Sequence, residues 1–210
     1  MKKQGTLVVV SGFAGTGKGT VMKELLRRFD SYALSVSATT RKPRPGEVDG
    51  REYFFKTLDE FEQMINADEF VEFACYVENY YGTPKKYVEE QLAAGKDVIL
   101  EIEIQGAVNI KSQFPESLLL FIAPPSADVL RERLVGRGTE TPEVIEERLA
   151  RAVEESRWIE RYDYVVVNDN LDECVNNVHQ IIQSAGWKVS RRLPEVEELR
   201  KQISKFSKGE

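Results

Sequence analysis

A glycine-rich turn near the N-terminus limits the fold more than any other feature of this sequence. The segment "VVVSGFAGTGKGTVMKEL", residues 8–25, passes from apolar residues through glycines into an amphipathic pattern. Its centre, Gly12 to Gly19, follows the phosphate-binding pattern G-x-x-x-x-G-K-[ST], except that Gly19 replaces the final Ser or Thr. In such a turn, backbone N–H groups and the N-terminus of the next helix form an anion cradle. The sequence therefore predicts a nucleotide-phosphate loop between a strand and a helix.

Within this loop the glycines permit a tight backbone path, and Lys18 is placed to reach the β- and γ-phosphates of a nucleotide. Gly19 lacks the hydroxyl that usually coordinates Mg²⁺, and Thr20 lies about 100° further around the helix axis, so it does not substitute. Since Mg²⁺ usually keeps several waters, we expect nucleotide and water to supply most of its ligands. The candidate ATP-binding residues of the loop are Gly12, Phe13, Ala14, Gly15, Thr16, Gly17, Lys18, Gly19 and Thr20.

Strand and helix patterns alternate along the rest of the chain. Apolar runs predict buried strands at 7–10, 32–36, 97–102, 118–122 and 164–167. Helical patterns fall at 18–29, 106–112, 127–136, 142–159 and 171–184. This alternation indicates an α/β domain with right-handed crossovers.

Two segments interrupt the alternation and divide the chain. We predict a core made of residues 4–37, 97–124 and 160–187, an insert at 38–96, and a charged helical lid at 125–159. Within the lid, Thr141 is a predicted N-cap followed by Pro142 at the first helical position. A core with two charged inserts is typical of an enzyme that closes over its substrates.

Residues 188–210 form a basic and then helical tail. An apolar stripe of Val196, Leu199, Ile203 and Phe206 is predicted on its helix. Periodicity favours packing of this helix on its own domain, and the alternative is a helix that faces a partner or a second copy.

Composition excludes several classes of function. The 210-residue chain carries a formal charge of −6, which argues against a general nucleic-acid binder. Cysteines occur only at Cys75 and Cys174 and the single histidine is His179, so disulfide frameworks, zinc sites and His-based triads are not expected. The first residues are too polar and the apolar run too short for a signal peptide or membrane span. We therefore expect a soluble, cytoplasmic protein that does not bind membranes.

Two acids, Glu101 and Glu103, lie in the segment "VILEIEIQG". Their spacing of two predicts that both point to one face of a strand. Because burying charge in an apolar strand is costly, a functional role is favoured over surface solvation, and Glu101 is the candidate for contact with Mg²⁺.

Several motifs occur in the order found in guanylate kinases: "GFAGTGKGT", "SVSATTRKPRPGEVDGREYFF", "FVEFACYVENYYGTP", "LEIEIQG", "APPS", "GRGTET" and "VVVND". Over residues 5–186 the chain resembles that family. The resemblance implies a P-loop NTPase-type α/β fold with a five-stranded parallel sheet flanked by helices, a small mixed GMP-binding insert and a helical lid. It also implies transfer of the γ-phosphoryl group of ATP to GMP with Mg²⁺, as part of purine nucleotide metabolism. The resemblance leaves open whether the chain forms a homo-oligomer.

The resemblance also assigns roles to residues. Implied catalytic residues are Lys18, Arg44, Arg137 and Arg148, and Asn168 and Asp169 lie beside the adenine of ATP. On the GMP side, the implied phosphate contacts are Arg41, Arg44, Tyr53 and Tyr81, the guanine contacts are Ser37, Glu72 and Thr83, and Glu101 and Glu103 lie close by. Arginine suits phosphate because its planar fork binds two oxygens at once. Arg133 is open between a lid role and a surface ion pair with nearby acids.

Two residues depart from the family pattern, and three other functions compete. Ser or Thr is common at position 19, and Asp is common at position 103 where this chain has Glu103.

Another nucleoside monophosphate kinase is a rival because "GKGT" also occurs there, but the guanine contacts disfavour it. A P-loop GTPase would need an N-K-x-D motif, which the sequence lacks. A kinase-like binding module would lack a working phosphate loop.

Overall fold

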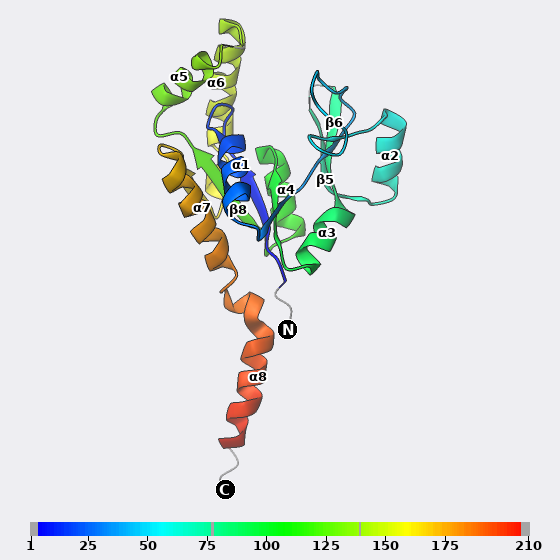
Figure 1. The fold of residues 1–210 in the computed structure, drawn as a ribbon, viewed down its shortest axis with the longest axis vertical. Coiled ribbons are helices and arrows are strands. Elements are labelled where there is room, and N and C mark those ends of the chain that lie inside the picture. The colour runs from blue at the N-terminus through cyan, green and yellow to red at the C-terminus, as the bar shows by residue number, and fades with distance from the viewer. Residues whose placement is uncertain (1–3, 77, 139, 207–210) are drawn as a thin grey trace.

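A parallel sheet forms the centre of the protein. The computed structural model describes residues 4–76, 78–138 and 140–206. Five parallel strands are ordered β2-β7-β1-β8-β9 (Figure 1). Their bounds are β1 Leu7–Ser11, β2 Tyr32–Leu34, β7 Asp97–Glu101, β8 Leu118–Ala123 and β9 Tyr164–Val167. The prediction of a five-stranded parallel α/β fold is confirmed, and each strand overlaps its predicted run.

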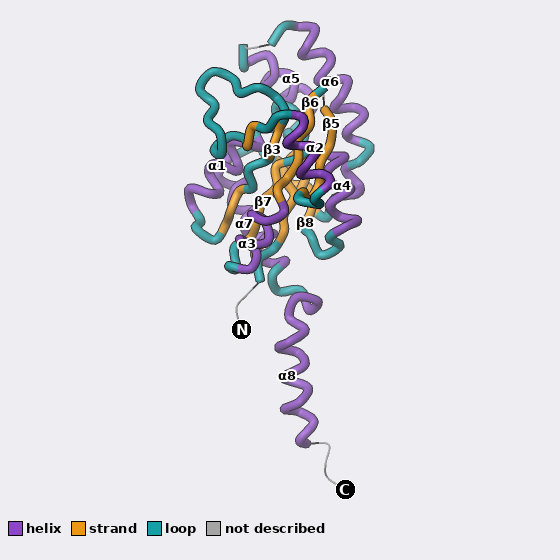
Figure 2. The backbone as a smooth tube through the Cα atoms, turned by 90° about the vertical axis from the view of Figure 1, so that its right-hand side faces the viewer, coloured by secondary structure: helices purple, strands orange, loops and turns teal. Residues whose placement is uncertain are grey.

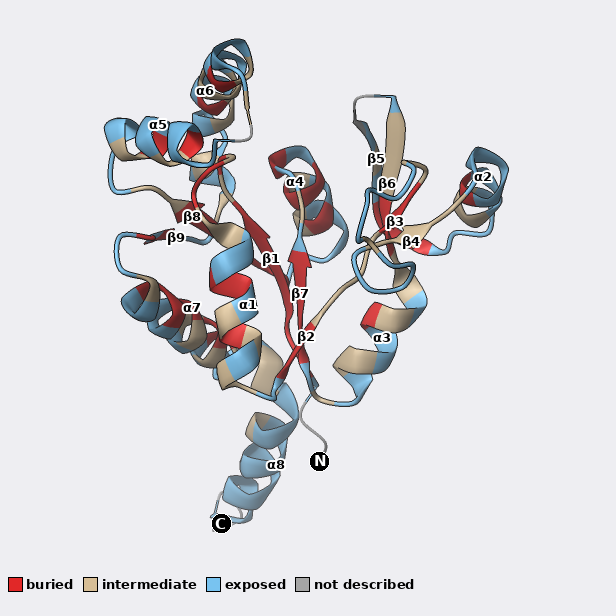
Figure 3. Cartoon of the chain, turned by 45° about the horizontal axis from the view of Figure 1, so that its top comes forward, coloured by how far each residue is buried: buried red, intermediate tan, exposed pale blue. Residues whose placement is uncertain are grey.

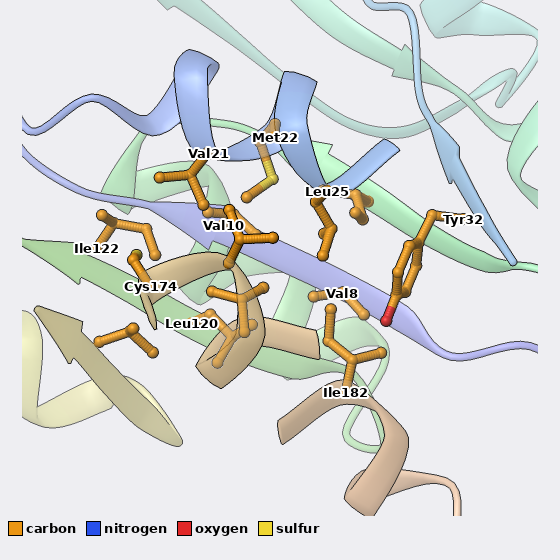
Figure 4. Close-up of a cluster of buried hydrophobic side chains, with 14 of the residues drawn as sticks. Val8, Val10, Val21, Met22, Leu25, Tyr32, Leu120, Ile122, Cys174 and Ile182 are labelled. Carbon is orange, nitrogen blue, oxygen red and sulfur yellow. The ribbon is translucent and has the colours of Figure 1, made fainter. Parts of the chain in front are cut away.

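Helices cover both faces of this sheet. On one face, Val8 and Val10 of β1 pack with α1 (Lys18–Arg28) and α7 (Leu171–Ala185), as Figure 4 shows. On the other face, Val9 packs with α3 (Lys85–Ala93) and α4 (Ile104–Gln113). Every β1 residue is buried because both faces are covered, which explains its uninterrupted apolar run (Figure 3).

A second, mixed sheet lies in the predicted insert. Its order is β4-β3-β6-β5, with β3 parallel to β4 and antiparallel to β6. The bounds are β3 Ala38–Thr39, β4 Phe54–Phe55, β5 Phe70–Tyr76 and β6 Asn79–Pro84. Helix α2 (Leu58–Asn66) begins with a capping box and packs Phe61 onto Phe70.

The predicted lid is a pair of helices beyond the carboxyl end of β8. Helix α5 spans Ala127–Gly136, and α6 spans Pro142–Ser156 and is followed by a short 3₁₀ turn at Ile159–Arg161. Thr141 and Pro142 occupy the N-cap and first positions of α6, as predicted. Leu130, Leu134 and Ile145 pack with Phe13 and Phe121 of the core, so the base of the lid is attached to the phosphate loop.

The tail extends away from the rest of the molecule. A 3₁₀ turn (Val189–Arg192) leads into α8 (Leu193–Ile203) and a second turn (Ser204–Phe206). Helix α8 has no buried residue and projects from the body in both views (Figures 1 and 2). The favoured prediction, that it packs on its own domain, is therefore wrong; residues 207–210 lie outside the described part. Among the described residues, no helix is long and apolar enough to cross a membrane.

Candidate active site

The predicted phosphate loop connects β1 to α1. Gly15 and Gly17 have φ of 97° and 87°, values that L side chains rarely adopt, and Gly17 is the N-cap of α1. A Cβ on Gly17 would also lie 2.7 Å from Nδ2 of Asn168. Glycine is therefore required there both for its backbone angles and for the close approach of a side chain. By contrast, a Cβ on Gly19 would meet no atom within 4 Å, so the missing hydroxyl does not reflect crowding.

Lys18 lies over the loop that precedes it. Its Nζ donates to the carbonyl oxygen of Gly12 at 2.5 Å. Burial lowers the pKa of Lys18, while the acidic groups of Glu101, Glu103 and Glu155 oppose that shift and the positive charge of Arg137 adds to it. One cation therefore faces carboxylates from β7, α4 and the lid. This arrangement suits an ammonium group that binds phosphate oxygens in exchange for carbonyl oxygens.

Asn168 and Arg133 support the loop from outside. Asn168 is buried after β9, and its Nδ2 donates to the Thr16 carbonyl oxygen at 2.7 Å. Arg133 donates from Nη2 to the Asn168 carbonyl at 2.9 Å and from Nη1 to the Thr16 carbonyl at 3.4 Å. Arg133 thus joins α5, the loop after β9 and the phosphate loop. Asp169 lies next to Asn168 and is exposed.

The remaining loop residues have different environments. Phe13 is buried with its ring 5.0 Å from that of Phe121, and Thr16 is buried with its hydroxyl bonded to the Phe13 carbonyl. Thr20 is exposed on α1. These two buried side chains hold the loop onto the core and leave its backbone to the ligand.

The acids at the end of β7 do not share one strand face. Strand β7 ends at Glu101, and Glu103 is the N-cap of α4. The prediction of two acids on one face of a strand is therefore wrong, because the chain turns into a helix between them. The charges of both acids still raise the pKa of Lys18 against the effect of its burial. Partial desolvation, together with the charge of Glu103, raises the pKa of Glu101 itself.

The lid contributes a row of charged groups along α6. Arg148 pairs with Glu140 at 2.8 Å, and Arg151 pairs with Glu155 at 2.9 Å. Arg151 also lies 3.6 Å from Glu103, so it links the lid to the core. Arg137 is the exposed C-cap of α5. Arg148 and Arg151 are thus both held by carboxylates.

The loop between β3 and β4 carries the predicted GMP-phosphate arginines. Arg41 pairs with Glu47 at 2.9 Å, and its guanidinium lies 5.3 Å from the ring centre of Tyr53. The second oxygen of Glu47 accepts from the backbone N–H of Arg44 at 2.7 Å, and the Arg44 side chain is exposed. Tyr53 contacts Tyr81 edge to face at 5.9 Å. Glu47 thus joins Arg41 to the backbone of Arg44, and ring contacts connect Arg41 through Tyr53 to Tyr81.

The predicted guanine contacts lie on the mixed sheet, at its side toward α4. Glu72 of β5 is 9% exposed, and its Oε1 accepts from the Thr83 hydroxyl at 2.9 Å. Burial raises the pKa of Glu72, while the bond from Thr83 opposes the shift. Its other oxygen faces Gly106 of α4, where a Cβ would approach to 3.2 Å. Ser37 precedes β3 and is half-buried.

Comparisons with known proteins now decide the family. The family model described as guanylate kinase matches residues 4–185. The chain belongs to the guanylate kinase family. It is 49% identical to the guanylate kinase of Lactococcus lactis over 191 residues, which cover 91% of this chain and 93% of the relative. It is 52% identical to that of Bacillus cereus over 181 residues, or 86% and 88% of the two chains.

A solved structure agrees with this family. Guanylate kinase from Anaplasma phagocytophilum is 32% identical, with a TM-score of 0.73 and 90% of each chain covered. The family matches the prediction from the ordered motifs, and the P-loop kinase fold that it implies is the one observed.

Three residues of this guanylate kinase site were missed in the sequence. Glu47 holds both insert arginines, and Arg151 and Glu155 join Arg148 along one face of α6. The spacing of 148, 151 and 155 by three and four residues was a readable signal of a shared helix face. Glu47 gave no such signal, because its role depends on the path of a loop.

The donor set near Lys18 fits Mg²⁺ delivered with a nucleotide. Glu101 at the end of β7 and Glu103 at the N-cap of α4 carry the carboxylate oxygens that this ion prefers, and the separate phosphate loop offers no hydroxyl at Gly19. Among the described residues, no group of three His, Cys, Asp or Glu side chains is arranged to hold a metal.

Proposed function

We propose that the site described above moves the γ-phosphoryl group of ATP to GMP, giving ADP and GDP. The observation that carries this proposal is the separation of two half-sites. A phosphate loop with Lys18 lies on the parallel sheet, and an arginine pair with the buried acid Glu72 lies on the mixed sheet. A phosphoryl donor and a guanine-containing acceptor would each have their own groups.

The reaction asks for positioning and charge neutralisation. An oxygen of the GMP phosphate, already ionised at neutral pH, forms the new bond to the γ-phosphorus as the bond to the β–γ bridging oxygen breaks. No general base is needed. This agrees with the position of the only histidine, His179, whose ring stacks on that of Phe29 with 3.7 Å between the ring centres. Lys18 would hold β- and γ-oxygens, and Arg137 and Arg148 would neutralise the transferring group. Mg²⁺, when bound with ATP, supplies further charge neutralisation and orients the phosphates.

Glu72 supports the choice of guanine. A carboxylate accepts hydrogen bonds from guanine N1–H and from the exocyclic 2-amino group, whereas adenine presents an unprotonated N1. A buried acceptor left without a donor costs about 1–3 kcal/mol, and more when charged. Ser37 and Thr83 would add polar contacts to the same base. The ATP side would extend to Asn168 and Asp169 near the adenine.

The deciding experiment compares acceptors. With ATP and Mg²⁺ as donor, we expect kcat/KM for GMP to exceed the values for AMP, CMP and UMP by several orders of magnitude, as a hydrogen-bonding site allows. Lys18→Ala serves as the control that activity arises at this loop. Comparable rates with AMP and GMP would contradict the assignment of guanine, and persistent activity in Lys18→Ala would contradict the assignment of the loop.

We also propose that the enzyme acts in the cytoplasm. Both cysteines are free thiols, and Cys75 is exposed. An exposed free thiol fits a reducing compartment, where disulfides are rare. Fractionation of cells that produce the protein tests this location, and recovery from an oxidising compartment with Cys75 oxidised would contradict it.

A further inference from the structure

In the described part of the chain, the contacts that fix helix α8 to the body lie at its base. In the turn before it, Arg191 donates to the Gly5 carbonyl at 2.6 Å, and Ser190 donates to Glu116 at 2.9 Å. Arg192 lies 4.4 Å from the ring centre of Trp187. Beyond these contacts the helix extends away from both sheets (Figures 1 and 2). Its direction is therefore set by the body, while its sides are left uncovered.

The uncovered sides include a continuous apolar stripe. Leu199 and Ile203 are each 54% exposed, and Phe206 is 86% exposed. An isolated helix of about this length is marginal in water, because nucleation is costly and few bonds follow it. Helix α8 has 11 residues and no buried side chain. A partner that covers the stripe would stabilise both the helix and the apolar surface.

The stripe follows a heptad pattern. Val196 and Ile203 occupy a positions, and Leu199 and Phe206 occupy d positions, so that the spacings are three, four and three residues. β-Branched residues at a with Leu at d favour two parallel strands in a coiled coil. The pattern therefore points to one further helix of the same orientation.

Charges beside the stripe select a second copy of this chain. In the same register Glu195 is a g residue and Arg200 is the next e residue. In a parallel pair, each g residue lies opposite the e residue of the following heptad of the partner. Glu195 of each copy would therefore face Arg200 of the other copy, twice per pair. The outward positions carry Glu197, Glu198 and Lys201, which are all charged.

We propose that α8 pairs with α8 of a second copy as a short parallel coiled coil. The pair has twofold symmetry along the helix, with identical surfaces in contact and both bodies at the same end. Because the stripe spans only two heptads, the dimer is weak and forms in a concentration-dependent way. The active site lies on other elements, so dimerisation and kinase activity are separable.

Charge reversal tests the pairing. Sedimentation velocity of the full chain over a range of concentrations is expected to show a monomer–dimer equilibrium. E195R and R200E should each weaken dimerisation about tenfold, since two attractive pairs become repulsive. Mixing E195R with R200E should restore association, because every pair across the mixed dimer is then attractive. Leu199→Ala should weaken the dimer by at least about 100-fold, because it removes a central layer.

Cysteine cross-linking tests the orientation. In a Cys75→Ser background, V196C places thiols at a layer that meets itself only in a parallel pair, and mild oxidation should yield a disulfide dimer. E197C, one residue along and facing outward, is the matched control that should not cross-link. GMP kinase activity reports that each variant is folded. A native chain that stays monomeric, reversals without effect on the dimer, or V196C that cross-links no better than E197C would each overturn the proposal.

Discussion

At the level of single residues, Glu72 is the side chain whose burial is expected to oppose stability and to favour binding. It is buried with one partner, Thr83, and its second oxygen faces the helix that contains Gly106. A guanine base would supply the missing donors. The residue is therefore expected to cost stability in the free enzyme and to provide selectivity in the complex, as is common at functional sites.

Replacing Glu72 with Gln should narrow the choice of base. The amide keeps the size of the side chain but turns one acceptor into a donor, which suits adenine N1. We expect kcat/KM for GMP to fall about 10–100-fold, from the magnitude of a charged hydrogen bond. The ratio of GMP to AMP efficiency should fall with it, while KM for ATP stays constant. Steady-state kinetics with both acceptors measures this, and an unchanged ratio would move guanine recognition to Ser37 and Thr83.

The same variant should be more stable than the native enzyme at neutral pH. Burial raises the pKa of the folded-state Glu72 above its unfolded value, so the folded state binds this proton more tightly. Its contribution is most favourable below the unfolded pKa, about 4.3, and is lost as pH rises through the raised folded pKa. Denaturant unfolding of Glu72→Gln should show a gain at pH 7 that shrinks below pH 4. Glu89→Gln, exposed on α3, is the control; an equal gain there would contradict this account.

At the level of elements, the conformation of the loop between β3 and β4 depends on the carboxylate of Glu47. Glu47 accepts from Arg41 and from the backbone of Arg44 through its two oxygens. A glutamine has a single acceptor oxygen and no negative charge, so it cannot form both of these hydrogen bonds. Glu47→Gln should therefore raise KM for GMP about 5- to 30-fold, equivalent to about 1–2 kcal/mol. KM for ATP should not change.

Glu52→Gln is the matched control for the loop. Glu52 also accepts from an arginine, Arg51, and from the backbone N–H of Val48, so its two hydrogen bonds in the described structure involve neither Arg41 nor Arg44. Equal losses in the two variants would mean that the loop is only being unfolded. A rise in KM for GMP confined to Glu47→Gln identifies a positioning role.

The lid arginines should divide into two groups. Arg137 and Arg148 extend from α5 and α6, and their removal is expected to lower kcat and kcat/KM together by about 10³, as for other arginines that act on a transferring phosphoryl group. Arg133 instead donates to carbonyls behind the phosphate loop, so Arg133→Ala should mainly raise KM for ATP. Kinetics at saturating substrates separate the groups; a loss of ATP affinity without a rate defect in all three would contradict this division.

Elements were easier to predict than side-chain partners. Strands β1, β7 and β8 could be located because a parallel strand covered on both faces needs consecutive apolar residues. Thr141 and Pro142 located the start of α6 because capping is local. Arg133, Glu47 and the break between Glu101 and Glu103 depend on how distant segments meet. The free course of α8 was missed because an apolar stripe predicts contact and leaves the identity of the partner open.

At the level of the whole molecule, the two nucleotides are expected to bind on different sheets, so their effects on thermal stability should be separable. Ligand at about 100 times its Kd adds about 2.7 kcal/mol, which raises Tm by roughly 5–10 °C in a protein of this size. In Arg44→Lys the shift produced by GMP should fall by several degrees, since lysine cannot form a bidentate contact. The shift produced by ATP should stay, and its loss instead would place Arg44 at the wrong nucleotide.

The order of strands in the parallel sheet also affects how the chain leaves the ribosome. Strand β1 is central, but its first partner along the chain is β7, where Leu7 lies opposite Val98. At about 5–20 residues per second, β1 would wait on the order of ten seconds before that partner is made. The β5–β6 hairpin, in contrast, pairs Tyr76 with Asn79 and has its partner almost at once. The acceptor side of the enzyme is thus expected to take shape during synthesis, while an apolar strand at the start of the chain depends on chaperones or on transient cover until the middle of the chain emerges.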